Sequence, residues 1–221
     1  MSAALEVSAL RRSFGGLRAV NDISFAVSAG QVKSVIGPNG AGKTTLVNLI
    51  SGMLSPDAGT IRKEGRDITR LKPFQRAALG ICRTFQTTRL FPQLSVLENV
   101  MVGRHPRTRA GFLAGALGLP WTWREERESR ERAHSILGEL GLAELAGELA
   151  GNLSFGHQRL AEIARALATE PSLLLLDEPA AGLNTHETQA MGQLILRIRV
   201  SGVTVLLVEH DMSLVMDISD E

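Results

Sequence analysis

Cysteine is nearly absent from this sequence, because Cys82 is the single one among 221 residues. One cysteine cannot form an internal disulfide, which excludes a secreted domain held by disulfides and makes a reducing compartment the default. An excess of either charge is also missing, because 24 basic side chains face 23 acidic ones and the formal net charge is +1. That balance argues against a protein that mainly coats nucleic acid, and we expect no nucleic-acid partner.

Long apolar runs are missing as well. The longest weakly polar stretch, Gly111–Pro120, is far shorter than the roughly 20 residues that a membrane-spanning helix needs. The N-terminus has no apolar run suited to a signal peptide. A hydrophobic fraction of 44% with 21% charged residues is typical of a globular protein with one compact domain, or with a core and a smaller lobe. Binding to a membrane protein stays open.

Continuous apolar runs separated by helical patterns indicate an α/β architecture with a parallel sheet. The runs predict strands at 31–36, 80–85, 172–176 and 203–208. Helices are predicted at 44–51, 155–168 and 185–199. Between Thr87 and Asn152 the buried-strand signal disappears, and 124–140 has the spacing of an amphipathic helix whose charged first half is a solvated face. The middle of the chain is therefore predicted to be a helical lobe inserted into the α/β core.

The first predicted strand runs into GPNGAGKT, which fits the pattern G-x-x-x-x-G-K-[ST]. Its glycines let successive backbone N–H groups converge on phosphate oxygens, and the following helix adds its positive dipole end. Lys43 would place its ammonium beside the β- and γ-phosphates. The hydroxyl of Thr44 would bind Mg²⁺, and Thr45 would reach the α-phosphate. A strand before the loop and a helix after it make a chance glycine-rich turn a poor alternative.

Polar residues also follow two other predicted strands. Ligands bind at the carboxyl ends of the strands in an open parallel sheet, so these residues should meet the phosphate loop. Asp177 would hold Mg²⁺ through water, and Glu178 would be the base that orients and activates a water. His210 follows the last strand and would bond the γ-phosphate and the attacking water. A structural role is the alternative for each of the three, above all for a lone histidine.

The segment LSFGHQR contains a second candidate anion site. Ser154 is a natural N-cap, and its hydroxyl with the helix N–H groups could bind phosphate. Gly156 allows a close backbone approach. A plain N-cap is the alternative. Because the segment belongs to the helical lobe, away from the chain's own phosphate loop, the phosphate would come from a partner chain.

Taken in order, GPNGAGKTT, Gln86, LSFGHQR, LLLLDEP, AGLN and EHD resemble the ATP-binding cassette ATPases, over essentially the whole chain. The resemblance implies a P-loop NTPase core of the RecA-like kind. That core has a mostly parallel sheet, an N-terminal antiparallel β part and an inserted α-helical subdomain. We expect the core at 1–86 and 160–221 and the signature subdomain at 87–159.

The resemblance also assigns roles to residues. Phe14 would stack on adenine, Gln86 would be a catalytic lever between Mg²⁺ and the membrane partner, and Ala181–Asn184 would cross to a second subunit. Two chains would face head to tail, with each ATP between the phosphate loop of one and 154–157 of the other. The predicted catalytic residues are Glu178, His210 and Gln86, and the predicted metal-binding residues are Thr44, Gln86 and Asp177. The predicted nucleotide-binding residues are Phe14, Gly37, Pro38, Asn39, Gly40, Ala41, Gly42, Lys43, Thr44, Thr45, Ser154, Phe155, Gly156 and His157.

Within that family, 83–105, 109–126 and EPAAGLN are similar to the ATPase subunits of branched-chain amino acid importers. Urea, amide and lipopolysaccharide transport ATPases share much of this pattern. The implied partners are membrane permeases, a second ATPase subunit (identical or paralogous) and, indirectly, a periplasmic or extracellular solute-binding protein. The implied location is cytoplasmic, at the inner face of the membrane. The apolar residues Leu90, Phe91, Leu94 and Val96 either pack inside the lobe or form a groove for a permease helix.

Three departures from the family pattern stand out. The signature is LSFGH rather than LSGGQ, the crossing loop ends in Asn184 rather than aspartate, and the chain ends soon after His210, so we expect a shortened C-terminus. A nucleic-acid or ribosome-associated cassette is a competing interpretation, but it usually carries two cassettes or long coiled insertions. A GTPase or small-molecule kinase is a third, and the guanine-reading N-K-x-D motif is absent.

Overall fold

The computed structural model describes residues 3–84, 90–105 and 120–221, with side chains of the last range described from 123 onward. It separates into two compact units, Met1–Gln86 with Ser172–Glu221, and Thr87–Pro171. Helix α6 (Phe155–Leu167) lies wholly within the second unit, where it packs on other helices.

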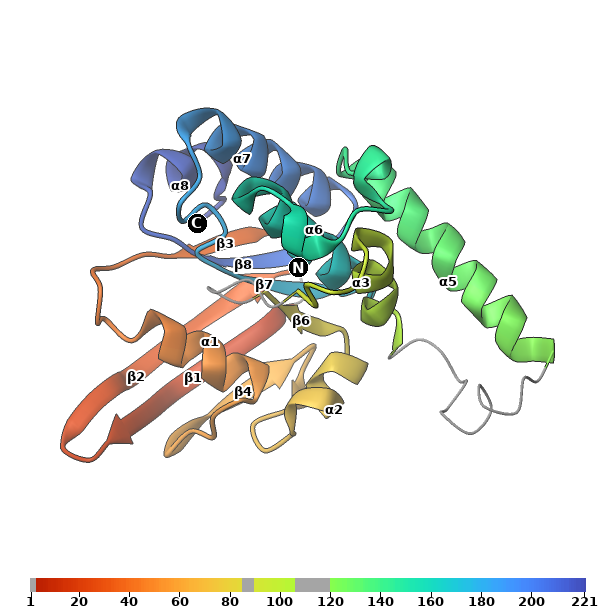
Figure 1. The fold of residues 1–221 in the computed structure, drawn as a ribbon. Helices are drawn as coiled ribbons and strands as arrows, with labels where there is room; N and C mark the ends of the chain where they lie inside the picture. Colours follow the sequence, from red (N-terminus) through yellow and green to blue (C-terminus); the bar gives the residue numbers. More distant parts are fainter. Residues whose placement is uncertain (1–2, 85–89, 106–119) are drawn as a thin grey trace. The chain divides into compact units, whose positions relative to one another are not determined.

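The first unit contains two sheets (Figure 1). A four-stranded parallel sheet has the order β3-β8-β7-β6, formed by Val32–Val35, Thr204–Val208, Leu173–Asp177 and Ile81–Arg83. A four-stranded antiparallel sheet has the order β2-β1-β4-β5, formed by Leu17–Ser28, Ala3–Phe14, Ala58–Lys63 and Arg66–Asp67. The predicted α/β class, with a parallel sheet and an N-terminal antiparallel part, is confirmed.

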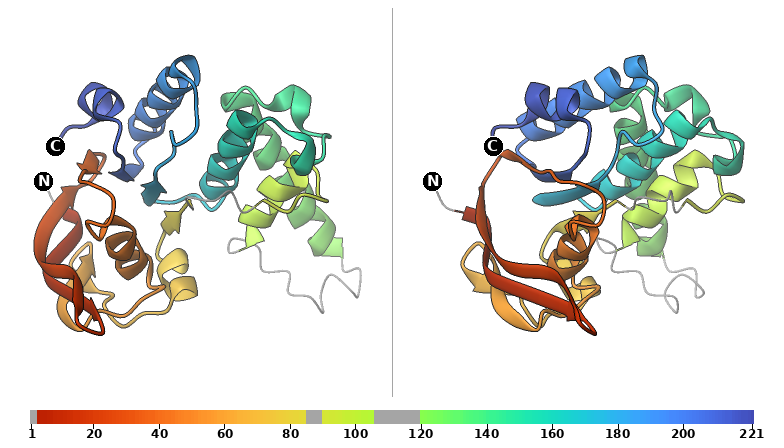
Figure 2. Two further views of the ribbon diagram at one scale, coloured as in Figure 1. Left: turned by 60° about the vertical axis from the view of Figure 1, so that its left-hand side comes forward. Right: turned by 90° about the vertical axis from the view of Figure 1, so that its left-hand side faces the viewer.

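Helices cover both sides of the parallel sheet. Helices α7 (Thr185–Val200) and α8 (Met212–Ile218) lie on one side, and α1 (Lys43–Ser51) with the antiparallel sheet lies on the other (Figures 1 and 2). Strands β7 and β8 are buried along their whole length, as expected for parallel strands covered on both faces. The apolar core sits between α1 and the two sheets and includes Leu10, Val27, Leu49, Leu175 and Val208.

Helix α1 is fixed at its C-terminal end by a buried arginine. Arg76, on the short helix α2 (Pro73–Ala78), donates to the carbonyls of Leu49 and Ile50 at 2.6 and 2.7 Å. It also bonds the carbonyls of Leu71 and Thr69. Burial lowers the pKa of Arg76 to about 10. A cation at the C-terminal end of a helix satisfies its last carbonyls and complements its dipole.

The second unit is helical in its described residues. It contains α3 (Val96–Gly103), α5 (Pro120–Glu139), α6 and two 3₁₀ turns at Ala143–Leu145 and Ala150–Asn152. Its core is formed by Val96, Val100, Ala133, Ile136, Leu137 and Ile163. The charged start of α5 carries exposed i,i+4 ion pairs such as Arg124–Glu128, so the prediction of a solvated face is confirmed. None of the described helices is long and apolar enough to cross a membrane.

Candidate functional site

The parallel pairing of β3, β7 and β8 brings three polar loops to one edge of the sheet. Asp177 pairs with Val208, and Val208 pairs with Val35, so the three strands end level with one another. The residues that follow are the phosphate loop, Glu178 and Glu209–His210. This juxtaposition of strand ends is the one that the sequence predicts for β3, β7 and β8. Gln86, expected at the end of the fourth strand, lies outside the described residues.

The phosphate loop ends in a glycine whose conformation and surroundings admit no side chain. Gly42 caps α1 with φ 89°, in the left-handed region, and makes no side-chain capping bond. A Cβ at this position would lie 2.0 Å from the Ala19 carbonyl oxygen. The first N–H groups of α1 are therefore left without a capping side chain, which is the arrangement that binds phosphate at helix N-termini.

Lys43 is buried and folds over the loop that precedes it. Its Nζ donates to the carbonyl of Gly37 at 2.7 Å and to that of Pro38 at 3.1 Å. The ammonium is thereby held at the mouth of the loop, where incoming phosphate oxygens can take over these hydrogen bonds. Thr44 is exposed and Thr45 is partly buried, both on the first turn of α1.

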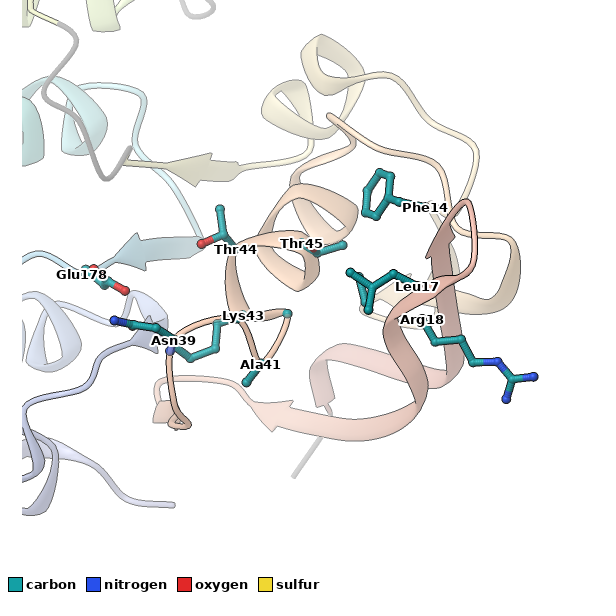
Figure 3. A pocket seen from close by; sticks show the side chains of 12 residues that line it. Phe14, Leu17, Arg18, Asn39, Ala41, Lys43, Thr44, Thr45 and Glu178 are labelled. Carbon is teal, nitrogen blue, oxygen red and sulfur yellow. The ribbon is translucent and has the colours of Figure 1, made fainter.

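A pocket of about 450 Å³ lies along this loop. Phe14, Leu17 and Arg18 of the β1–β2 hairpin lie at one end, Glu178 lies at the other, and the loop residues line the space between them (Figure 3). The remaining lining residues are Ala19, Asn39, Gly40, Ala41, Gly42, Lys43, Thr44 and Thr45. The aromatic end suits the base of a nucleoside triphosphate and the loop of N–H groups suits its phosphates, while the carboxylate end could hold a water beside the terminal phosphate. Gly37 and Pro38 are not among the lining residues.

Phe14 is 45% exposed at the hairpin end of the pocket. The Arg12 guanidinium lies 5.0 Å from the centre of its ring, and Arg12 is itself fixed by an ion pair with Asp57 at 2.7 Å. A ring held in this way offers a π-face to a base without selecting its hydrogen-bonding edge.

Asp177 is buried at the end of β7. Its Oδ2 accepts a hydrogen bond from Arg83 Nη2 at 2.9 Å, and its buried Oδ1 has no hydrogen-bond partner among the described residues. Burial raises the pKa of the Asp177 carboxyl, against the lowering effect of Arg83. An unpartnered buried carboxylate oxygen is costly and suits a cation or its bound water.

The donor set fits magnesium rather than a metal held by protein alone. The described residues contain no group of three or more His, Cys, Asp or Glu side chains that could hold an ion. Mg²⁺ is usually bound by one or two protein oxygens, several waters and the phosphates of a nucleotide. The Thr44 hydroxyl and Asp177 Oδ1 are the groups here that could supply those protein oxygens.

Glu178 follows Asp177 with a left-handed backbone, φ 50°, unusual for a residue other than glycine. Its N–H donates to the Val208 carbonyl at 2.8 Å, which fixes the turn, and its side chain lines the pocket. Backbone strain of this kind costs about 1–3 kcal/mol and concentrates at functional sites. Nothing in the sequence pattern signals this conformation.

His210 is placed differently from the pocket residues. Its side chain is 56% exposed, and it is not among the residues that line the pocket. Its neighbour Glu209 is fully buried, accepting from the Ala180 N–H at 2.9 Å and from the His210 N–H at 3.0 Å. Glu209 thus ties the end of β8 to the loop after Glu178, a role that the sequence analysis missed.

The signature segment lies in the second unit. Ser154 is the N-cap of α6, and its Oγ accepts from the His157 N–H at 3.4 Å. Ser154, Phe155 and His157 are exposed and Gly156 is partly buried. The Arg159 guanidinium lies 5.1 Å from the centre of the Phe155 ring. The first turn of α6 is therefore accessible, and the phenylalanine that departs from the family pattern is supported from its own helix.

The fold and the pocket define a nucleotide-binding cassette ATPase. The family model for the ABC transporter matches residues 20–181, and the chain belongs to this family. It is 49% identical to the high-affinity branched-chain amino acid transport ATP-binding protein BraF of Pseudomonas aeruginosa, over 98% of this chain and 85% of the relative. Its identity to LivG of Escherichia coli strain K12, named in the same way, is 44% with the same coverage.

Solved structures agree with this assignment. A nucleotide-free ATP-binding cassette from an ABC transporter superposes with a TM-score of 0.86 and 35% identity, covering 100% of this chain and 86% of the other. A bacterial ABC transporter cassette solved as a dimer has a TM-score of 0.81 and 25% identity, covering 96% and 90%. The chain is an ATP-binding subunit with the ATPase activity of its family.

Proposed function

We propose that this chain hydrolyses ATP to drive an importer of branched-chain amino acids. The observation that carries the proposal is the similarity to BraF and LivG, which extends over 98% of the chain and includes the pocket. The chain would sit at the inner face of the membrane against permease subunits, with a solute-binding protein on the far side. Urea, amide and lipopolysaccharide remain the solutes that the test must exclude.

In this proposal the pocket orients ATP along its length. Phe14 stacks on the adenine, the backbone N–H groups of 39–42 with Lys43 bind the β- and γ-phosphates, and Thr45 reaches the α-phosphate. Gly37 and Pro38 contribute through their carbonyls, which hold Lys43 Nζ. Thr44 and Asp177 hold Mg²⁺, which supplies positive charge to the phosphate oxygens. Gln86 completes this set and links it to the permease.

The hydrolytic step needs a water held in line with the γ-phosphate. Glu178, at the far end of the pocket from Phe14, orients this water and accepts its proton as it attacks. His210 bonds the γ-phosphate, which requires its exposed side chain to turn toward the nucleotide. Glu209 holds the backbone from which His210 extends, so that turn involves the side chain rather than the strand end.

A second chain completes each site. The first turn of α6, from Ser154 to His157, binds the γ-phosphate held by the phosphate loop of the partner chain. The solved dimer of a related cassette supports such pairing. ATP then lies between the two chains, and hydrolysis removes the group that joins them.

The permease contact is proposed at the start of the helical unit. Of the four apolar residues considered there, Val96 is fully buried and packs inside the unit, whereas Phe91 is 49% exposed. The Arg165 guanidinium lies 5.9 Å from the centre of the Phe91 ring. Phe91 is thus the strongest candidate of the four for contact with a permease helix.

The test is reconstitution with candidate permease subunits in liposomes. Binding protein loaded with leucine, isoleucine or valine should stimulate ATP hydrolysis and solute uptake. Loading with urea or an amide should not stimulate hydrolysis, and neither should lipopolysaccharide supplied in the liposomes. Lys43→Ala should abolish tight nucleotide binding and all uptake, because it removes the ammonium beside the β- and γ-phosphates. Stimulation by another solute class would overturn the solute assignment. Unchanged ATP affinity in Lys43→Ala would overturn the site.

A further inference from the structure

We propose that Arg83 is a positioning residue that holds the two magnesium-binding elements in register. It lies at the end of β6, outside the pocket lining. The inference rests on the proposed roles of Thr44 and Asp177. In this proposal Arg83 contacts neither the nucleotide nor the metal. It sets the position of Thr44 relative to Asp177.

The guanidinium of Arg83 bridges α1 and β7. Its Nη1 donates to Asn48 Oδ1 at 2.5 Å, and its Nη2 donates to Asp177 Oδ2 at 2.9 Å. The side chain is only 8% exposed, so water does not weaken the pair as it does at a surface. The bridge connects elements that are far apart in the sequence, with Arg83 and Asp177 separated by 94 residues.

Asn48 and Thr44 share one face of α1. They are four residues apart, the spacing that places side chains one above the other on a helix. A bond to Asn48 therefore fixes the rotation of α1 on the turn next to Thr44. The bond to Asp177 Oδ2 fixes the carboxylate and leaves Oδ1, which has no hydrogen-bond partner in the described chain, for the metal or its water.

Arginine suits this task for a geometric reason. Its planar fork donates to two acceptors at fixed angles, whereas a lysine ammonium is a point charge on a flexible stem. Groups that orient metal ligands in this way typically contribute about 10–100-fold to metal affinity. The same guanidinium also carries a positive charge close to Asp177, and that charge repels a cation.

Arg83→Met removes the bridge and the charge together. The charge repels a cation but also lowers the pKa of the Asp177 carboxyl, so its loss has two opposed effects on magnesium binding. The variant that separates positioning from charge is therefore Asn48→Ala. Asn48→Ala removes the shorter of the two bonds from Arg83 Nη1 to α1, leaves the 3.4 Å bond to Ser51 Oγ and keeps the charge. Positioning therefore predicts weaker magnesium binding, and charge alone predicts no change.

The experiment titrates Mg²⁺ into the purified chain with a fluorescent, non-hydrolysable ATP analogue. We expect Arg83→Met to raise the half-saturating Mg²⁺ concentration about tenfold. Arg83→Lys and Asn48→Ala should raise it by less. Affinity for the analogue in EDTA should stay at the wild-type level for all three. Arg66→Met, which removes an exposed arginine on β5, is the matched control for charge and should leave the titration unchanged.

Two reference variants separate failure of this inference from failure of the proposed site. Thr44→Ala and Asp177→Asn should each weaken Mg²⁺ binding, and Arg83→Met should add little in the Asp177→Asn background, because it acts through Asp177. If neither reference variant changes the titration, the metal site is misassigned and the inference falls with it. If both reference variants weaken Mg²⁺ binding but Arg83→Met and Asn48→Ala leave it unchanged or tighter, the role of Arg83 is wrong and the metal site stands. If urea unfolding shows that the Arg83→Met variant is not folded, the Mg²⁺ titrations of Asn48→Ala and Arg83→Lys decide the outcome.

Discussion

The two helices that face phosphate in this proposal begin in different ways. Helix α1 begins at Gly42, which is left-handed and offers no capping side chain, whereas α6 begins at Ser154, whose hydroxyl accepts from the third residue of the helix. The start of α1 keeps its N–H groups for a ligand of its own chain. The start of α6 is closed by its own serine, so a partner's phosphate must exchange with a hydrogen bond already made. The N–H groups at the start of α1 are thus free of a capping side chain before phosphate binds, whereas at α6 phosphate has to displace the Ser154 hydroxyl from the His157 N–H.

The largest effect is expected for Gly42→Ala, which changes the start of α1. The added Cβ would meet the Ala19 carbonyl oxygen at 2.0 Å, and the left-handed backbone disfavours any residue other than glycine. We expect loss of measurable ATP binding by calorimetry. Gly40→Ala is the matched control, since Gly40 is also left-handed but a Cβ there would meet nothing within 4 Å. Equal losses in both variants would show that strain alone, rather than the close approach, governs the loop.

Glu178→Gln tests the chemical end of the pocket. The amide keeps the shape of the side chain but cannot accept the proton of the attacking water. We expect hydrolysis to slow by about 10²–10⁴-fold while ATP binding survives. The variant should run as a dimer with Mg²⁺-ATP and as a monomer with ADP in size-exclusion chromatography with light scattering. Adding Ser154→Arg should prevent that dimer, and hydrolysis at the wild-type rate would remove Glu178 as the base.

Ser154→Ala removes the side chain that caps α6. Loss of the cap should lower the free energy of unfolding by about 1 kcal/mol, measured in urea. It should also weaken the ATP-dependent dimer of Glu178→Gln, with no change in ATP binding by a single chain. Ser95→Ala is the control, because Ser95 caps α3 in the same way and has no proposed contact with phosphate. If both serine variants weaken the dimer equally, Ser154 is only a cap.

The smallest effect is expected at α3, whose N-terminus is closed by a charged capping box. Glu98 bonds the N–H and hydroxyl of Ser95 at 2.7 and 2.8 Å, and these bonds lower its pKa. A carboxyl group whose pKa is lower in the folded chain than in the unfolded chain stabilises the fold at any pH above its unfolded pKa. This stabilisation is lost as the pH falls through the folded pKa. Glu98→Gln should therefore be slightly less stable than wild type at pH 7. The difference should vanish as the pH is lowered below about 4 in urea unfolding; a constant difference would contradict the ionic origin.

Local patterns in the sequence were sufficient to predict the parallel sheet and the phosphate loop. Strands β3, β7 and β8 begin and end within one residue of their predicted ranges, because buried parallel strands need continuous apolar runs. Helix α6 also lies within one residue of its predicted range, but its packing against α3 and α5 is not encoded in its own periodicity. Strands β1 and β2 came only from the family resemblance, since their burial does not alternate regularly and their pairing contains register shifts.

The candidate site likewise has residues that could be predicted from the sequence and contacts that could not. Residues in the phosphate loop, Asp177 and Glu178 carry their chemistry in a short motif. The bonds that hold them do not, because Arg83 meets Asp177 across 94 residues and Glu209 meets Ala180 across 29. The left-handed backbone of Glu178 and the 2.0 Å approach at Gly42 likewise depend on neighbours from other strands.

The connection between β6 and β7 has a consequence for how this protein can vary. These strands are direct neighbours in the sheet, yet the chain between them forms the entire helical unit. The unit is thus tethered at the carboxyl end of β6 and the amino end of β7, whose relative position is set by the parallel pairing of Ile81 with Leu173 and of Arg83 with Leu175. Insertions there cost little in loop-closure entropy and leave the strand register intact. A lineage could therefore change most of the helical unit to suit a different transporter while inheriting the phosphate loop, Asp177 and Glu178 unchanged.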